Sequence, residues 1–134
     1  MTLPAPTPDE LSTAWWEHLA AHRVVVQRCP SCARRRIQRL PSCPYCGAQG
    51  AQGGEDLEVP GTGTVYSFVR VHRPLTPASA DEVPYCVATV DLDGGGRVFA
   101  RVEPHPDVAI GSSVVARFVD HDGWTELRFA LVGD

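Results

Sequence analysis

The sequence contains no lysine, and its twelve basic Lys/Arg residues are all arginines, outnumbered by sixteen Asp and Glu residues. The formal net charge is −4, whereas domains that bind nucleic acids are usually basic, so the composition argues against a general nucleic-acid binder. Complete absence of lysine beside plentiful alanine, glycine, proline and valine is typical of a GC-rich genome. No single arginine can therefore be interpreted as selected over lysine for its forked geometry.

Long apolar runs and a leader-like N-terminus are also missing. The longest uncharged apolar runs span only a few residues, whereas a transmembrane helix needs about 20. The first ten residues are proline-rich and acidic and lack the basic and apolar regions of a signal peptide. We therefore expect a cytoplasmic protein without membrane association. With 134 residues, 43% of them hydrophobic, the chain is long enough for one real core, which excludes global disorder.

Four of the five cysteines form two C-x-x-C pairs. Cys29 pairs with Cys32 and Cys43 with Cys46, and ten residues separate the pairs. Two residues between cysteines let a tight turn aim both sulfurs at one point, and two such turns supply the ligands of a tetrahedral zinc site. Disulfides are disfavoured in the cytosol, and a thioredoxin-like redox site needs a single pair within an α/β pattern. The spacing therefore predicts bound Zn²⁺, with rubredoxin-type iron less favoured.

This metal is expected to be structural, because four cysteines leave no coordination position for water or substrate. Metal binding supplies about 10–16 kcal/mol of apparent free energy in small zinc modules, and a segment of about twenty residues has almost no core of its own. The fifth cysteine, Cys86, lies in an apolar extended run with no His or carboxylate beside it. We interpret it as a small buried hydrophobic residue rather than a nucleophile.

Three segments are predicted: an N-terminal helical segment (residues 1–23), a zinc ribbon (24–54) and a barrel domain (55–134). In the ribbon, residues 36–40 are expected to form a short extended arm that Pro41 ends before the second cysteine pair. The predicted fold class is therefore mainly β, with one N-terminal helix.

The helix is expected to begin with Thr7 as its N-cap and Pro8 at its first position, and to continue to His22. Trp15 lies on its apolar face, and Trp16 points about 100° away from Trp15. Two alternatives remain open at this point: one tryptophan packs on this chain while the other contacts a partner, or both pack on this chain.

The barrel domain contains five β-type runs. They cover residues 63–72, 85–92, 97–102, 113–119 and 124–131. A glycine-rich turn joins the second run to the third, and two prolines between the third and the fourth leave room for a turn rather than a helix. Five short strands in about 75 residues predict a small closed barrel of the OB type.

Four arginines are concentrated between the cysteine pairs of this otherwise acidic chain: Arg34, Arg35, Arg36 and Arg39. They are interpreted either as a solvated charged loop or as contacts to nucleotide phosphates, such as those of coenzyme A, or to an acidic partner surface. By contrast, the histidines His72, His105 and His121 are scattered in the sequence. No Ser–His–Asp or paired-carboxylate arrangement stands out, so the sequence indicates no catalytic site.

The order of these motifs resembles one family, DUF35, whose members carry a rubredoxin-like zinc ribbon followed by an acyl-CoA-associated OB-fold domain. The matching residues are Trp15-Trp16-Glu17, the four paired cysteines, Pro41, Gly47, the strand Gly-Thr-Gly-Thr-Val-Tyr-Ser at residues 61–67, Pro84-Tyr85, residues 90–93 and Ile110-Gly111. The likeness covers nearly the whole chain. One departure is Ala33, where a glycine commonly follows the first cysteine pair.

The resemblance implies a non-catalytic accessory subunit that binds and stabilises a thiolase-fold partner. Family members occur with thiolases and HMG-CoA synthase, with acyltransferases, and with thiolase-like enzymes that cleave steroid side chains by retro-aldol chemistry. In these complexes the reactive residues lie on the partner, and the DUF35 subunit helps to form its acyl-CoA channel. We therefore expect a hetero-oligomer in lipid metabolism or steroid degradation.

Two other functions are considered. Zinc ribbons and OB barrels both occur in proteins that bind single-stranded nucleic acids, and either Tyr66 and Phe68, or Phe99 between Arg97 and Arg101, would stack on bases. The acidic composition speaks against this alternative. A free-standing enzyme that uses Cys86 or a histidine is the weakest of the three.

Overall fold

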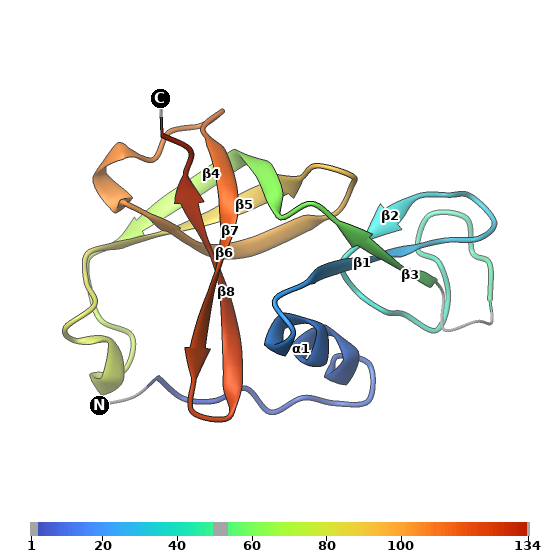
Figure 1. The fold of residues 1–134 in the computed structure, drawn as a ribbon, viewed down its shortest axis with the longest axis horizontal. Coiled ribbons are helices and arrows are strands. Elements are labelled where there is room, and N and C mark those ends of the chain that lie inside the picture. Colours follow the sequence, from blue (N-terminus) through green and yellow to red (C-terminus); the bar gives the residue numbers. More distant parts are fainter. Residues whose placement is uncertain (1–2, 50–53, 134) are drawn as a thin grey trace.

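The computed structural model describes residues 3–49 and 54–133. Within these ranges the chain is mainly β, as predicted, with one helix, α1 (Thr13–Ala20). Figure 1 shows α1 between a small sheet on the ribbon side and a barrel on the other side. The small sheet is antiparallel and has the order β2-β1-β3, with β1 at Val24–Arg28, β2 at Arg35–Arg36 and β3 at Glu55–Val59.

Five strands form the closed barrel: β4 (Thr62–Val71), β5 (Tyr85–Leu92), β6 (Arg97–Glu103), β7 (Ser113–His121) and β8 (Trp124–Leu131). Every predicted barrel strand is present, with each end within two residues of its expected position. The strand order β4-β5-β6-β8-β7 closes through β4 and β7, and β6 pairs with β8 in parallel. A 3₁₀ turn at His105–Asp107 joins β6 to β7, as the two prolines there predict. The five-stranded OB-fold is therefore confirmed.

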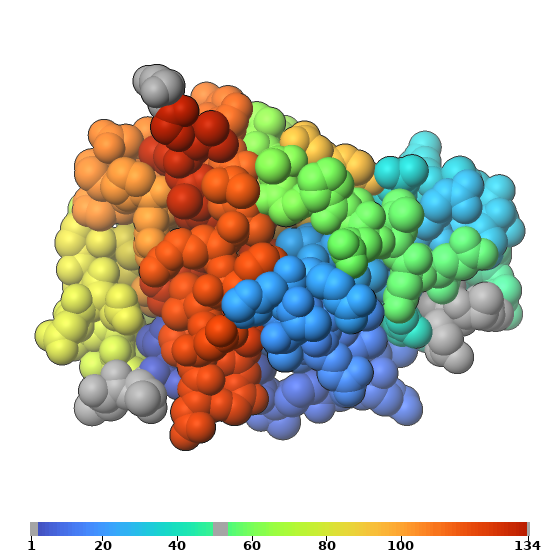
Figure 2. Space-filling view, in the orientation of Figure 1, coloured from blue at the N-terminus to red at the C-terminus, as the bar shows by residue number. Residues whose placement is uncertain are grey.

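One hydrophobic core extends through most of the molecule. Phe129 and Val90 are fully buried inside the barrel, and Leu19 of α1 and Val26 of β1 belong to the same cluster. The space-filling view shows α1 in contact with the β7–β8 hairpin on one side and with the small sheet on the other (Figure 2). The helix and the first ribbon strand are thus anchored on the barrel.

The predicted start of the helix at Thr7 is wrong. The helix begins at Thr13, with Ser12 as its N-cap, and ends at Ala20. The Asp9 carboxylate accepts hydrogen bonds from the backbone N–H groups of Leu11 (3.1 Å) and Ser12 (2.8 Å). Because Asp9 caps this turn, the preceding residues remain outside the helix.

Two features of the small sheet differ from the expectation. The extended arm between the cysteine pairs is β2, which covers only Arg35–Arg36 instead of residues 36–40. Strand β3 was not expected and pairs with β1 over its whole length, from Glu55 opposite Arg28 to Val59 opposite Val24. The expected boundary between ribbon and barrel at residues 54/55 therefore falls just before a strand that belongs to the ribbon's sheet and leads directly into the barrel.

The β5–β6 turn packs against the small sheet and holds the ribbon on the barrel. Gly94, Gly95 and Gly96 all have positive φ angles, between +92° and +105°. A Cβ atom on Gly95 would lie 2.8 Å from Cβ of Arg35, and one on Gly94 would lie 2.9 Å from Cγ1 of Val59. Only glycine permits this close approach without a rearrangement. Among the described residues, no helix has the length and apolarity needed to cross a membrane.

Candidate metal centre and ribbon–barrel cleft

The four paired cysteines converge on one point. Their Sγ atoms all lie within 4.8 Å of one another, and the Cys29–Cys46 and Cys32–Cys43 Sγ distances are both 3.7 Å. A tetrahedron with metal–sulfur bonds of about 2.3 Å has edges of about 3.8 Å, whereas a disulfide requires about 2.05 Å. The geometry therefore fits a closed tetrahedral metal site.

Both cysteine turns have the same backbone structure. In each, the carbonyl of the first cysteine accepts a bond from the N–H four residues later, and its own N–H donates to the carbonyl five residues later, all at 2.9 Å. The residue four positions after the first cysteine of each pair has a positive φ, +66° at Ala33 and +78° at Gly47. Ala33, the one departure from the family pattern, thus occupies the position where the other turn has a glycine.

Backbone donors favour the thiolate form of Cys43, whereas the pKa of Cys46 is raised to about 11, because the backbone N–H of Ala48 lowers it less than burial and the neighbouring sulfurs raise it. Burial raises the pKa of the Cys43 thiol, but the backbone N–H groups of Cys46 and Tyr45, together with the side chains of Cys32 and Cys29, outweigh burial and lower the pKa to about 6. The Tyr45 N–H lies 3.4 Å from the Cys43 Sγ. Since metals bind the thiolate, this arrangement prepares the site for a cation. The remaining cysteine, Cys86, is fully buried in the barrel core, as predicted, and burial raises its pKa.

The four clustered arginines do not form one patch. Arg36 is buried opposite Gln27 of β1, and Arg39 forms an ion pair with Asp56 of β3. Arg34 and Arg35 are exposed. The Arg34 guanidinium lies 4.8 Å from the centre of the Tyr45 ring. Arg35 donates to the carbonyl oxygen of Gly94. Arg36 is therefore buried in the sheet and Arg39 is paired with a strand of that sheet, whereas Arg34 and Arg35 are exposed at the surface.

An open cleft of about 460 Å³ lies between the ribbon and the barrel. Its ribbon wall includes Arg35 and Tyr45, and its barrel wall includes Arg97 and Phe99 of β6. Arg97 is held by Asp91 at 2.6 Å. Phe99 and Tyr45 expose 74% and 54% of their surface. That Arg97 and Tyr45 share one cleft could not be predicted from the sequence, because only the folded chain brings these distant residues together.

Both adjacent tryptophans contact the chain itself. Trp15 and Trp16 are half-buried and pack against the core. The Trp16 ring meets the Trp124 ring of β8 edge-on, with 6.0 Å between centres and 78° between planes. Of the two alternatives left open, the structure shows packing of both rings on this chain, and contact with a partner stays a prediction.

Both halves of the chain match known family descriptions. Residues 16–50 match "ChsH2, rubredoxin-like zinc ribbon domain", and residues 57–119 match "ChsH2, C-terminal OB-fold domain". A "DUF35 domain-containing scaffold protein" of Methanothermobacter thermautotrophicus is 31% identical over 113 residues, which cover 81% of this chain and 83% of that protein. The chain belongs to the DUF35 family.

Two further relatives are named as alpha subunits of hydratases. The chain is 36% identical over 121 residues to a "Probable enoyl-CoA hydratase alpha subunit" of Thermomonospora curvata and 28% identical over 122 residues to the "3-oxo-4,17-pregnadiene-20-carboxyl-CoA hydratase alpha subunit" of Mycobacterium tuberculosis. About 90% of this chain is covered in each case, but it spans only 36% and 37% of the two relatives.

A solved structure shares the whole architecture. The "Ltp2-ChsH2(DUF35) aldolase" matches with a TM-score of 0.79 and 33% identity, over 95% of this chain and 98% of the matched chain. By name, two of these relatives are alpha subunits of CoA-thioester hydratases, and the solved structure is an aldolase with a DUF35 component.

Proposed function

We propose that this chain is a cytoplasmic, non-catalytic accessory subunit that binds and stabilises a thiolase-fold enzyme acting on acyl-CoA thioesters. The observation that carries the proposal is the match along nearly the full chain to the structure whose name joins a DUF35 component with an aldolase. The relatives named as a scaffold and as acyl-CoA hydratase subunits support the same role. A thiolase, an acyltransferase and a steroid side-chain retro-aldolase are the partners that this role fits.

The positions of the cysteines support a non-catalytic role. Four converge in the metal centre, and the thiol of Cys86 is inside the barrel with its pKa raised by burial. A thiol in this environment is a poor nucleophile, because the thiolate is the reactive form and a nucleophile must be accessible to substrate.

We assign zinc rather than iron to the metal centre, in agreement with the zinc ribbon description that matches residues 16–50. Freshly purified protein is expected to be colourless and to contain one zinc ion per chain by elemental analysis. A coloured protein that contains iron contradicts this assignment.

The ribbon–barrel cleft is proposed to contact the phosphates of coenzyme A. Coenzyme A carries a diphosphate and a 3′-phosphate, which guanidinium groups and backbone donors bind well. Arg34 and Arg35 are exposed on the ribbon side, and the exposed rings of Tyr45 and Phe99 offer faces on which adenine would stack. Because Arg36 is buried and Arg39 is paired with Asp56, the proposed phosphate contact is limited to the first two arginines.

Co-expression with a thiolase-like protein tests the accessory role. The two chains are expected to purify as one hetero-oligomer that turns over acyl-CoA, while this chain alone shows no turnover. A chain that remains a monodisperse monomer beside every such partner overturns the proposal. In the active complex, Arg35→Ala is expected to raise the KM for acyl-CoA about tenfold without lowering kcat, because it removes an interaction made equally in the ground and transition states. Arg73→Ala, an exposed arginine outside the cleft, is the matched control.

Binding of single-stranded nucleic acid is a second candidate, supported by exposed aromatic rings on the barrel. Tyr66 of β4 and Phe99 of β6 expose 55% and 74% of their surface, and the Arg97 guanidinium lies 3.9 Å from the centre of the Tyr66 ring. A gel shift with short oligonucleotides separates the two candidates. Steep salt dependence favours nucleic-acid binding, and no shift at low salt excludes it.

A further inference from the structure

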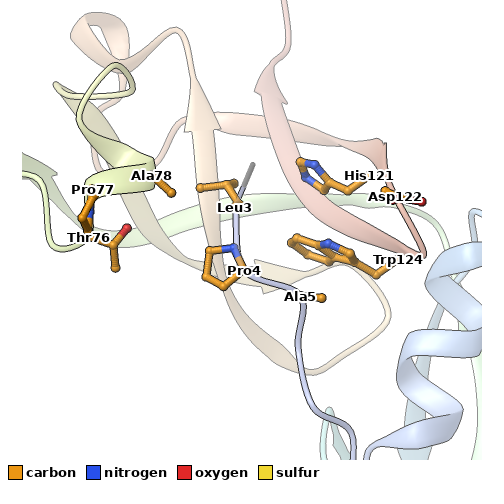
Figure 3. A pocket seen from close by; sticks show the side chains of 9 residues that line it. All are labelled: Leu3, Pro4, Ala5, Thr76, Pro77, Ala78, His121, Asp122 and Trp124. Carbon is orange, nitrogen blue, oxygen red and sulfur yellow. The ribbon is translucent and has the colours of Figure 1, made fainter. Parts of the chain in front are cut away.

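An open hollow of about 470 Å³ lies at the end of the barrel that carries the β7–β8 turn. Its walls come from residues 3–5, from the β4–β5 loop around the 3₁₀ turn Pro77–Ser79, and from the β7–β8 turn. Figure 3 shows side chains from these three segments around one space. None of the residues that line it lines the ribbon–barrel cleft.

This position in the barrel is one at which OB-folds bind ligands. The loop between the first and second barrel strands and the loop between the fourth and fifth flank the ligand-binding face of an OB-fold. In this chain these are the β4–β5 loop and the β7–β8 turn. The hollow thus lies between two loops that the fold commonly uses for binding.

Trp124 gives the hollow an aromatic wall of fixed orientation. Its ring meets the Trp16 ring edge-on and is stacked with His121, at 4.3 Å between centres and 20° between planes. His121 Nε2 lies 2.8 Å from Glu126 Oε1, and Arg128 donates to the same carboxylate at 3.0 Å. The aromatic surface is therefore set before any ligand binds.

The chain's own N-terminal segment indicates which ligand fits. Residues 3–6 read Leu-Pro-Ala-Pro and have no regular secondary structure. Leu3 is half-buried. Figure 3 shows Leu3 and Pro4 across the hollow from His121 and Trp124. Proline-containing extended segments dock on aromatic-lined grooves because little backbone entropy is lost when they bind.

We propose that this hollow is a docking groove for an extended, proline-containing apolar segment of a partner polypeptide. In the free chain, residues 3–5 border the same groove and compete with that segment. The inference goes beyond the proposed function, since it requires neither an acyl-CoA enzyme nor the ribbon–barrel cleft.

A peptide titration tests the groove in the full chain. The probe is a fluorescent peptide Leu-Pro-Ala-Pro-Thr-Pro, and its binding is measured by anisotropy. The double variant Leu3→Gly/Pro4→Gly loosens the resident segment. It is expected to bind the probe about tenfold more tightly than the natural chain, because competition lowers the apparent affinity by the fraction of open groove.

Two further substitutions to arginine, each combined with Leu3→Gly/Pro4→Gly, test whether the peptide binds in the hollow. Ala78→Arg places a long side chain in the groove and is expected to abolish probe binding. Ala80→Arg lies in the same loop, is exposed and does not line the hollow, so it is expected to leave binding unchanged. Equal affinity in both variants, or no binding of the probe to the loosened chain, overturns the proposal. Binding of a small apolar dye without binding of the peptide also overturns it, in favour of a small-molecule site.

Discussion

The ribbon and the barrel are stabilised in different ways, although they are parts of one chain. Between residues 29 and 49, the only buried side chains are Cys29, Arg36 and Cys43. Two of these three are metal ligands, so the interior of the ribbon is the metal site itself. The barrel has an apolar interior, with Phe129 among its fully buried side chains. The ribbon is too small for a hydrophobic core, so cation binding is expected to stabilise its fold, whereas hydrophobic burial stabilises the barrel.

The joint between the two regions connects the four-cysteine site with the ribbon–barrel cleft. Arg35 follows the first cysteine turn, and Tyr45 lies within the second. Both line the cleft whose other wall is β6. The β5–β6 glycine turn fixes the distance between the walls, because the small sheet packs directly on it. The metal therefore positions one wall of the cleft and the barrel positions the other.

Loss of a metal ligand gives the largest expected effect. Cys43→Ser is expected to reduce the metal content of the purified protein almost to zero and to unfold the ribbon, because metal binding supplies about 10–16 kcal/mol in comparable modules. Elemental analysis measures this directly. Cys86→Ser is the matched control: it places a hydroxyl in the barrel core but is expected to retain the metal. Full metal content in Cys43→Ser would contradict a four-cysteine site.

A cavity in the barrel should have the next largest effect and leave the metal bound. Phe129 is fully buried, so Phe129→Ala is expected to lower the free energy of unfolding by about 3–5 kcal/mol in urea denaturation. Phe99→Ala removes the same side chain from an exposed position and is expected to change stability by about 0.5 kcal/mol or less. Similar losses for the two variants would refute the assignment of the barrel core.

Substitutions in the β5–β6 glycine turn test whether this turn holds the ribbon on the barrel. Gly95→Ala is expected to destabilise the chain by roughly 1–3 kcal/mol and to loosen the ribbon, because it adds a clash with Arg35 to a positive φ. Gly123→Ala in the β7–β8 turn has the same kind of backbone, with φ +83°, but no atom within 4 Å of the added Cβ. It is expected to leave amide exchange in the ribbon unchanged. If both variants loosen the ribbon equally, the β5–β6 turn is not the joint.

Substitutions at the positive-φ residues of the two cysteine turns are expected to have smaller effects on stability, of opposite sign in the two turns. Ala33→Gly is expected to stabilise the ribbon by up to about 1 kcal/mol, because a left-handed backbone is strained for alanine. Gly47→Ala is expected to destabilise the equivalent turn by a similar amount. Competition with a metal chelator measures both variants, and a loss of metal affinity in Ala33→Gly would show that the strain is absent.

Protonation of Glu126 at low pH should lower the stability of the barrel, and this is the smallest of the expected effects. Burial raises the pKa of this carboxyl, but hydrogen bonds from Arg128 and His121 outweigh burial and lower the pKa below its usual range. The stabilisation is therefore fully present above the unfolded-state pKa of about 4.3 and is lost as the pH falls through the lower folded-state pKa. Glu126→Gln should flatten the pH profile of the melting temperature below about pH 4.3. The exposed Glu58→Gln serves as the control, and an unchanged profile in Glu126→Gln would contradict the assignment.

Local patterns explain what could be predicted from the sequence. The barrel strands alternate between core and surface, as in β5, where Cys86 and Ala88 point inward and Val87 outward, and this alternation is visible in the sequence. The metal site was equally predictable, because the spacing within each cysteine pair sets a tight turn. Strand β3 was not, since its residues Glu55 to Val59 are mostly acidic and form a strand by pairing with β1.

Tertiary contacts explain what the sequence analysis missed. Arg36 belongs to a run of three arginines, and only its pairing with Gln27 places it inside the molecule. The cleft wall from Arg97 and Phe99 meets the ribbon because of the glycine turn, whose role in packing is not visible in the sequence. The capping role of Asp9 was missed because Thr7 and Pro8 form a plausible start on their own.

Hydrogen exchange of the full chain, with metal and after chelation, tests most directly whether the ribbon depends on the metal while the barrel does not. After chelation, amides in residues 29–49 are expected to exchange rapidly, while those of β5 and β8 remain protected. Protection of residues 29–49 that survives complete removal of the metal would contradict this account.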